Sequence, residues 1–475
     1  MKTRSELIEW GRRDLSGLAD YCFSLQNEVS LLKQQQALTS RNSSKPPSQD
    51  GYCKPKPKSL RTRSGKKSGG QPGHPGHTLI PVENPDHVFV HFLKDCPCGC
   101  GSDLRNQPVL RHETRQVFDL PPQKLEVTEH RAEVKRCPRS GQEVCAQWPK
   151  EVTAPVQYGA RFHAWLTYCN VQQLLPLDRI GQMSDDLFGH YVSAATIYAA
   201  LHSADQALTA FQTAVVQQIK QVPVAHADES GVRVMGTLHW LHSISTETLT
   251  WYGIHQKRGK EAIDFFGILP AYHGRLIHDC FQSYFDLPCD HGLCNAHILR
   301  ELTFLHEELQ QPWAGALHKL LIEMNDEVND YKTLYAGGLP FARQNHYCRR
   351  YRKHLRQGRA ANPPLRLVAV TKKRGRRKQT KTQNLLDRME RYEKEVLAFL
   401  FDFRVPFTNN LAEQDIRMIK VRQKISGAFR TLTGAQTFAT IRSYCSTVRK
   451  CGQHIFPALV SAIKGNPFIP VFHTG

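Results

Sequence analysis

The chain lacks any long apolar run. No stretch of its 475 residues approaches the roughly 20 consecutive apolar residues that a membrane-spanning helix needs. The N-terminal residues also lack the apolar segment of a secretory signal peptide. We therefore expect a cytoplasmic protein with no membrane partner. A chain of this length is too long for one hydrophobic core, so about three or four domains are expected.

Acidic residues are almost missing from two segments. Residues 41–80 carry nine Lys or Arg against one acid, Asp50, and residues 341–381 carry fifteen Lys or Arg and no acid. The net charge of +20 therefore arises from these segments, and the remainder is close to neutral. A solvated loop explains either segment alone. Two such concentrations indicate a polyanionic partner, most simply nucleic acid, and hence a nucleoid-associated protein.

Large apolar side chains are nearly absent from residues 41–80, where Pro, Gly, Ser and Lys dominate. Such a segment cannot bury a core and is expected to be flexible until it meets a phosphate backbone. Residues 1–40 instead predict a helix with a heptad seam. The seam consists of Leu15, Leu18, Cys22, Leu25, Val29 and Leu32. A short coiled coil, and thus a homo-oligomer, is the natural use of this seam, and a helix packed on its own domain is the alternative.

The fourteen cysteines do not suggest a disulfide framework, because several of them cluster. Cys96, Cys98 and Cys100 form one tight knuckle, and Cys137 and Cys145 follow a strand-like alternation. Structural zinc takes four thiolate or imidazole ligands, commonly from two knuckles. The second knuckle is irregular, because serine stands at position 140 and leaves Cys145 as the substitute. A zinc module is predicted, with buried free thiols as the alternative.

Two helices are expected in residues 155–220. Gly189 ends the first of them and Ser193 caps the second. The pattern resembles a helix-turn-helix, in which Ala194, Thr196 and Tyr198 would stand near the start of the recognition helix. A plain helical hairpin is the alternative.

From residue 221 the hydrophobic period changes to two, which predicts two or three antiparallel strands. Asp228 ends the strand that begins VPVAHA, and Asp279 ends the later strand RLIH. An unpaired carboxylate beside an apolar run is costly. Two of them on neighbouring strands would repel unless a divalent cation lay between them.

A third carboxylate, Glu413, opens the helix of PFTNNLAEQDIRMIKV. Helix capping explains it locally, with Asn410 as N-cap and an ion pair from Glu413 to Arg417. Alternatively, three carboxylates would hold two metal ions about 4 Å apart for phosphodiester chemistry. Oxygen ligands select Mg²⁺ or Mn²⁺. Glu229 and Asp415 remain rival ligands.

Ordered motifs along nearly the whole chain resemble a known family. They are SSKPPSQD, GGQPGHPG, the cysteine module, VQYGARFHAWLTY, QLLPLDRI, ADESGVRVMG, HQKRG, LPAYHGRLIHDCFQSY, LCNAHILREL, PFTNNLAEQDIRMIKVRQKISGAFRT and IRSYCSTVRK. In this order they resemble the large DDE transposase of the bacterial insertion-sequence-66 family. The resemblance implies that Asp228, Asp279 and Glu413 are the catalytic acids. It also matches Cys294 and His297 to a Cys-x-x-His pair, which we interpret as structural.

The resemblance implies an α+β multidomain fold with an RNase H-like catalytic core. The expected domains are a leucine-zipper-like helix (1–40), a flexible basic linker (41–85), a zinc-binding module (86–152), a helical region with the helix-turn-helix (153–220), the first part of the RNase H-like core (221–294), a helical basic insertion (295–400) and the C-terminal core helices (401–475).

The function that follows is a DNA transposase that binds terminal inverted repeats, cuts DNA and transfers the freed strand to target DNA. Two sets of cations are expected to contact DNA: Arg417, Lys420, Arg422 and Lys424 after Glu413, and Lys372, Lys373, Arg374, Arg376, Arg377 and Lys378 in the insertion. Accessory proteins of the same element are expected partners. The alternatives are a catalytically silent DNA-binding protein and an RNase H-like nuclease that cuts without joining.

Overall fold

The computed structural model describes residues 4–39, 42–43, 79–363 and 379–471. The chain divides into two compact units. Residues 79–131 belong to one unit together with residues 186–190, and each named helix or strand lies wholly or largely in the other. The basic residues 372–378 lie outside the described residues. In the part of the chain that is described, no helix is both long and apolar enough to cross a membrane.

A five-stranded mixed sheet forms the centre of the larger unit. Its strands are β3 (Val224–Val234), β4 (Thr237–Ser245), β5 (Thr250–His255), β6 (Arg275–His278) and β7 (Asp290–Leu293), in the order β5-β4-β3-β6-β7. The strands β3, β4 and β5 are antiparallel neighbours, whereas β6 and β7 run parallel to β3. The expected mixture of helices and strands is confirmed, including the antiparallel strands after residue 221.

A two-residue hairpin joins β3 to β4. Met235 and Gly236 both have positive φ, at 51° and 75°. Positive φ at both central positions gives a turn whose twist matches that of the flanking strands. The turn allows β3 to continue to Val234, well beyond the VPVAHA segment. Asp228 therefore lies within an eleven-residue strand, and the expectation that it ends the strand was wrong.

Helices cover both faces of the sheet. Tyr252 of β5 donates its backbone N–H to Ser443 of α15 (Leu432–Lys450) at 2.9 Å. Its hydroxyl donates to the Asp415 carbonyl of α14 (Asn410–Ile425). On the other face, Trp251 packs edge-on against Phe266 of α7 (Lys260–Phe266), with ring centroids 4.8 Å apart. The sheet is therefore buried on both sides, with one core shared by the strands and these helices.

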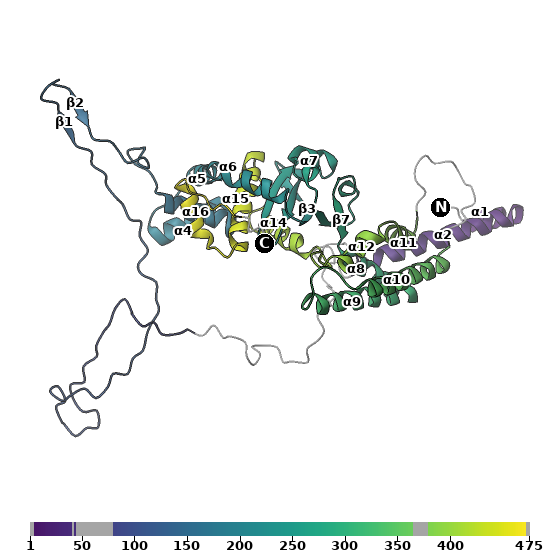
Figure 1. Ribbon diagram of the computed structural model, residues 1–475, viewed down its shortest axis with the longest axis horizontal. Helices are drawn as coiled ribbons and strands as arrows, with labels where there is room; N and C mark the ends of the chain where they lie inside the picture. Colours follow the sequence, from purple (N-terminus) through teal and green to yellow (C-terminus); the bar gives the residue numbers. More distant parts are fainter. Residues whose placement is uncertain (1–3, 40–41, 44–78, 364–378, 472–475) are drawn as a thin grey trace. The chain divides into compact units, whose positions relative to one another are not determined.

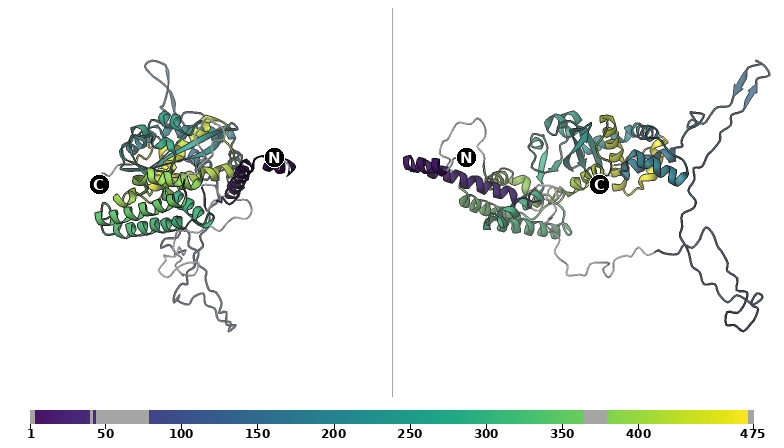
Figure 2. Two further views of the ribbon diagram at one scale, coloured as in Figure 1. Left: turned by 90° about the vertical axis from the view of Figure 1, so that its right-hand side faces the viewer. Right: turned by 180° about the vertical axis from the view of Figure 1, so that it is seen from behind.

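A second helical layer follows β7 and has its own core. It contains α8 (Asn295–Glu307), α9 (Pro312–Lys332), α10 (Phe341–Ala361), α11 (Lys381–Arg391), α12 (Glu393–Val396) and α13 (Ala398–Phe401). Figure 1 shows this layer beside the β7 edge of the sheet, and the two views of Figure 2 agree. The layer lies where the sequence predicted helices between Asp279 and Glu413.

Further helices precede the sheet. They are α3 (Ala160–Thr167), a π-helical turn (Tyr168–Gln172), α4 (Leu177–Phe188), α5 (Ala194–Ala207) and α6 (Thr209–Ile219), and the C-terminal α16 (Ile455–Ile463) packs on α3 and α5. The N-terminal segment forms α1 (Arg4–Arg13) and α2 (Leu15–Gln36) rather than one helix. Most of the α2 seam is exposed, with Leu15 at 75% and Leu32 at 53%.

Candidate active site

Two carboxylates meet where β6 ends beside β3. The parallel register pairs Ala225 with Leu276 and His226 with Ile277. Extending this register by two residues places Asp228 opposite Asp279. Because β6 ends at His278, Asp279 leaves the strand at the point where the parallel pairing stops. Side chains at equivalent positions of neighbouring strands share a face of the sheet, so both acids lie at one site.

The start of α14 is attached to β3 by Asn409, which is 1% exposed. Its Nδ2 donates to the Ala227 carbonyl at 2.8 Å, and its Oδ1 lies 2.9 Å from Nδ1 of His226. Asn409, rather than Asn410, is the N-cap residue, and its side chain makes no cap hydrogen bond. The predicted capping box was therefore wrong, because the side chain that would cap the helix binds a strand instead.

Glu413 lies one turn into α14, next to the segment that follows β7. Its Oε1 is 3.8 Å from Sγ of Cys294 and 3.9 Å from Nδ1 of His297. The ion pair expected with Arg417 is absent from the described part of the chain. Glu413 therefore faces the interior of the site rather than its own helix surface.

Burial and neighbouring charges make the ionised forms of Asp228 and Asp279 unfavourable. Burial, together with the charges of Glu229, Asp279 and Glu413, raises the pKa of Asp228 to about 8. Burial also raises the pKa of Asp279, although the nearby Arg258 opposes that shift. Carboxylates gathered away from water favour either a proton or a divalent cation. The donor set therefore fits Mg²⁺ or Mn²⁺, which prefer oxygen ligands.

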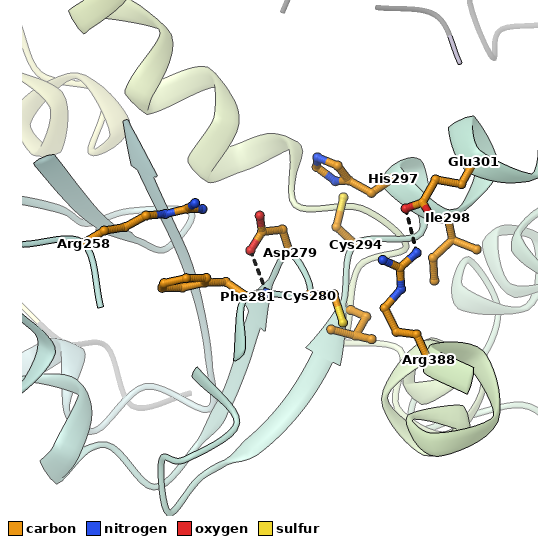
Figure 3. A pocket seen from close by; sticks show the side chains of 10 residues that line it. Arg258, Asp279, Cys280, Phe281, Cys294, His297, Ile298, Glu301 and Arg388 are labelled. Atoms are coloured by element: carbon orange, nitrogen blue, oxygen red, sulfur yellow. Dashed lines mark hydrogen bonds and ion pairs between the residues drawn. The ribbon is translucent and has the colours of Figure 1, made fainter. Parts of the chain in front are cut away.

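A cavity of about 230 Å³ opens beside Asp279. Figure 3 shows Asp279 between Arg258 on one side and Cys294 with His297 on the other. The lining residues are Arg258, Asp279, Cys280, Phe281, Leu293, Cys294, His297, Ile298, Glu301 and Arg388. The Asp279 carboxylate accepts the backbone N–H of Phe281 at 3.1 Å. This contact holds the side chain at the cavity wall.

Glu229, the rival neighbour of Asp228, has other partners. Its carboxylate accepts from Nε of Arg258 at 2.6 Å and from the Tyr284 hydroxyl at 2.7 Å. The Arg258 guanidinium also stacks over the Phe281 ring, 4.3 Å from its centroid. Glu229 thus holds Arg258 beside Asp279. Sequence reasoning assigned no role to Arg258, although it lies in the quoted HQKRG motif.

Asp415, the other rival, belongs to a polar cluster on a different side of α14. It pairs with Nζ of Lys450 at 2.6 Å and accepts from the Ser245 hydroxyl at 2.7 Å. Both charged side chains are 14% exposed. Its charge is therefore matched by a cation of α15.

The four cations that follow Glu413 differ in their surroundings. Lys420 donates to the Gly231 carbonyl at 3.1 Å, and Arg422 lies 3.5 Å from the centroid of the Phe429 ring. Burial lowers the pKa of Arg422 to about 10. Arg417, Lys420 and Lys424 are exposed, whereas Arg422 is partly buried. Arg422 and the hydrogen bond of Lys420 therefore support the fold around β3, and Arg417 and Lys424 face solvent.

The cysteines of the predicted zinc module fall into two local groups. The sulfurs of Cys96, Cys98 and Cys100 lie within 4.8 Å of one another, and hydrogen bonding with Ser102 lowers the pKa of Cys100 to about 6. The short strands β1 (Val134–Arg136) and β2 (Glu143–Cys145) form a hairpin. Cys137 follows β1 at the turn, whereas Cys145 pairs with Val134 at the other end. The completion of a zinc site by either residue stays a prediction.

The predicted helix-turn-helix segment contains α4 and α5. Gly189, with φ of 62°, follows α4, and the Ser193 side chain accepts the Thr196 N–H at the start of α5. Both boundary predictions are confirmed. Tyr198 is 39% exposed, and its hydroxyl oxygen is 3.0 Å from the hydroxyl oxygen of Thr431. DNA recognition by this helix stays a prediction.

Comparison with protein families gives three matches. The model described as "Transposase IS66 family" matches residues 155–437, more than half of the chain. The model described as "zinc-finger binding domain of transposase IS66" matches residues 94–139, which include Cys137 but not Cys145. A family of unknown function matches residues 18–79. A search of curated proteins gave no match.

Proposed function

The chain belongs to the IS66 family of transposases, and on this premise we propose that it binds the terminal inverted repeats of its element, cuts DNA there and joins the freed ends to target DNA. Membership in the family and its zinc-finger match already indicate a transposase that binds DNA. The proposal adds the chemistry, the residues that perform it and the DNA sequence class that is recognised.

The observation that supports the proposal is the register of β3 and β6, which sets Asp228 opposite Asp279. The charges of Asp279 and of Glu413 on α14 both contribute to the raised pKa of Asp228. The order β5-β4-β3-β6-β7, with β3 at the junction of antiparallel and parallel pairing, supports an RNase H-like core. Asp228, Asp279 and Glu413 would hold Mg²⁺ or Mn²⁺. The bound metal would supply activation of the attacking oxygen and stabilisation of the leaving oxygen of a phosphodiester.

The chain's own residues position the DNA strand. Arg258 lines the cavity with its guanidinium fixed by Glu229 and by the Phe281 ring. We assign its remaining N–H groups to a phosphate oxygen, because a guanidinium held in place binds phosphate with little loss of side-chain entropy. Arg417 and Lys424, which are exposed on α14, would hold the strand nearby.

The remaining parts of the protein are proposed to recognise and pair the element's ends. The matched zinc-finger model and the sulfur cluster of Cys96, Cys98 and Cys100 indicate a zinc-binding module. We assign sequence recognition to this module and to α5. The exposed seam of α2 supports a homo-oligomer, because exposing a row of apolar side chains to water is unfavourable. A homo-oligomer would also hold the two ends of the element together. Accessory proteins of the element are further proposed partners.

Strand cleavage on a labelled duplex tests the proposal. The duplex carries the terminal repeat, and reactions contain Mg²⁺ or Mn²⁺ with wild-type protein, Asp279→Asn, or the matched control Asp290→Asn. Asp290 lies on the neighbouring strand β7, and its side chain is 75% exposed and pairs with Arg275. Nicking at the repeat boundary with joined products is expected from wild type and Asp290→Asn, and none from Asp279→Asn.

Other outcomes separate the alternatives. Cutting without joined products would favour a nuclease. Specific binding without cutting would favour either a silent DNA-binding protein or a transposase that needs the element's accessory proteins, and addition of those proteins separates the two. Cleavage that survives in Asp279→Asn would show that the carboxylates have been assigned wrongly.

A further inference from the structure

Three potential metal ligands lie close together next to Asp279. The proposed DNA chemistry uses one of them, Glu413, and gives no role to the other two. The three ligands are the thiol of Cys294, the imidazole of His297 and the carboxylate of Glu413, whose ligand atoms lie within 4.8 Å of one another. We propose that these three side chains form a site for a thiophilic divalent cation, with Zn²⁺ as the reference ion.

The spacing of the ligand atoms is close to that of a tetrahedral site. Zinc bonds of about 2.3 Å to sulfur and about 2.0 Å to nitrogen or oxygen place sulfur and oxygen about 3.5 Å apart at a tetrahedral centre, and nitrogen and oxygen about 3.3 Å apart. The distances from Glu413 Oε1 are 3.8 Å to the Cys294 sulfur and 3.9 Å to the His297 nitrogen. Side-chain movements of a few tenths of an ångström would complete the geometry.

Local structure supplies the ligands from two elements. Cys294 is the N-cap residue of α8, and His297 lies three residues later in the first turn. This spacing brings both side chains to the same end of the helix. Figure 3 shows the Cys294 sulfur and the His297 ring next to each other at the cavity. Glu413 approaches from α14, which Asn409 attaches to β3. The ligands are therefore held by packed elements rather than by a loose loop.

Two polar atoms support a ligand at this place. Nδ1 of His297 is buried and has no hydrogen-bond partner among the residues that the structure describes. Buried ring nitrogens are usually paired, so a histidine that only filled the core would leave this atom unexplained. The backbone N–H of Asn409 donates to the Cys294 sulfur at 3.1 Å. Burial raises the pKa of the Cys294 thiol to about 11, and this donor opposes that shift. The thiol proton would leave to solvent when the cation binds, because the metal stabilises the thiolate.

The donor set favours zinc over magnesium. Thiolate and imidazole select zinc-like ions, whereas magnesium prefers oxygen. Three protein ligands leave the fourth tetrahedral position open, as in zinc sites that bind water or substrate. Here Cys294 and His297 also line the 230 Å³ cavity, so the open position faces solvent and incoming DNA.

Glu413 belongs both to this site and to the proposed catalytic carboxylates. The effect of zinc on DNA cleavage described next therefore rests on the proposed function. A cation held by Cys294, His297 and Glu413 would withdraw that carboxylate from the set completed by Asp228 and Asp279. Zinc at low concentration would therefore inhibit strand cleavage supported by Mg²⁺. Substitution of Cys294 would raise the inhibitory zinc concentration by ~10-fold or more, since loss of even an outer partner of a metal site costs about that much affinity.

The first test counts ions and does not need DNA. Full-length wild type, Cys294→Ser, His297→Asn and the control Cys280→Ser are dialysed against Zn²⁺, and bound zinc per chain is measured by mass spectrometry. Cys280 lines the same cavity but is not in the ligand cluster. The zinc-finger cysteines contribute equally in all four proteins. Two ligand variants are used so that one misfolded protein, identified by circular dichroism, does not decide the result.

One zinc ion fewer per chain is expected in Cys294→Ser and His297→Asn than in wild type and Cys280→Ser. Equal zinc content in all four proteins would overturn the site. Zinc inhibition is then measured relative to the zinc-free rate of each protein. Loss of the ion without relief of inhibition would support the site and overturn its effect on cleavage. A protein that cuts no DNA, even with the element's accessory proteins added, would refute the proposed function and leave the ion count unaffected.

Discussion

Two acids of α14, Glu413 and Asp415, stand two residues apart and are expected to respond in opposite ways to removal. Asp415→Ala removes the carboxylate that pairs with Lys450. The Lys450 side chain is only 14% exposed, so its positive charge would lose this ion pair in a largely buried place. Breaking such a pair by removing one partner costs about 3–5 kcal/mol. The Ser245 hydroxyl would also lose its acceptor. Because Nζ of Lys450 keeps its hydrogen bonds to the Thr246 and Leu249 carbonyls, we expect a loss of unfolding free energy at the lower part of this range.

Glu413→Ala is expected to leave stability within about 0.5 kcal/mol of wild type or to raise it slightly. Within the described part of the chain, the Glu413 carboxylate has only the Cys294 thiol, at 3.8 Å, as a hydrogen-bond donor. It also contributes to the raised pKa of Asp228, so its removal relieves like-charge repulsion. DNA cleavage should be abolished in this variant.

Urea unfolding followed by tryptophan fluorescence measures both effects, because Trp240 and Trp251 lie in the central sheet. Glu323→Ala is the control for an exposed ion pair, with Arg350 as partner, and should lose at most about 1 kcal/mol. The reasoning would be refuted if Asp415→Ala unfolded at the wild-type urea concentration, or if Glu413→Ala were the less stable of the two.

Three further predictions follow from the same contacts. Asn409→Ala removes the buried hydrogen bond to the Ala227 carbonyl and the contact with Nδ1 of His226, so it should cost about 1–3 kcal/mol in urea unfolding. Unchanged stability would contradict the attachment of α14. Burial lowers the pKa of His242 to about 4. Stability should therefore fall as pH drops from about 6.5 to 4, by up to about 3 kcal/mol, because the unfolded chain binds the proton first; a His242→Gln variant that kept the full pH dependence would exclude this cause. Val29→Glu places a charge on the exposed α2 seam, where Val29 is 49% exposed, and should lower the oligomeric state in sedimentation while urea unfolding of the sheet is unchanged; an oligomer that survived would place the interface elsewhere.

Local pattern predicted much of the secondary structure correctly. The change of hydrophobic period at residue 221 marked the strands, and Gly189 and Ser193 marked a helix end and a helix start. These features depend on neighbours within about four residues, so they can be read along the chain. The motifs also identified the family, because their order along the chain can be recognised without knowing how the chain folds.

Errors arose where the deciding partner lies far away in sequence. Asp228 was expected at a strand end, but pairing with β4 carries β3 on to Val234. Asn410 was expected to cap α14, but Asn409 takes the N-cap position and its side chain binds His226, 183 residues away. The roles of Glu229 and Asp415 could not be separated by spacing, since Arg258 and Lys450 become visible as partners only in three dimensions.

By itself, the sequence determined the family, the basic segments and the types of most helices and strands. The tertiary structure alone decided which acids face one another and which are matched by cations. The physical reason is that a strand register and a helix attachment are collective properties of the packed sheet. Asp228 lies opposite Asp279 because β3 and β6 pair in one register. Glu413 meets Cys294 and His297 because contacts such as those of Asn409 and Gln423 hold α14 against β3.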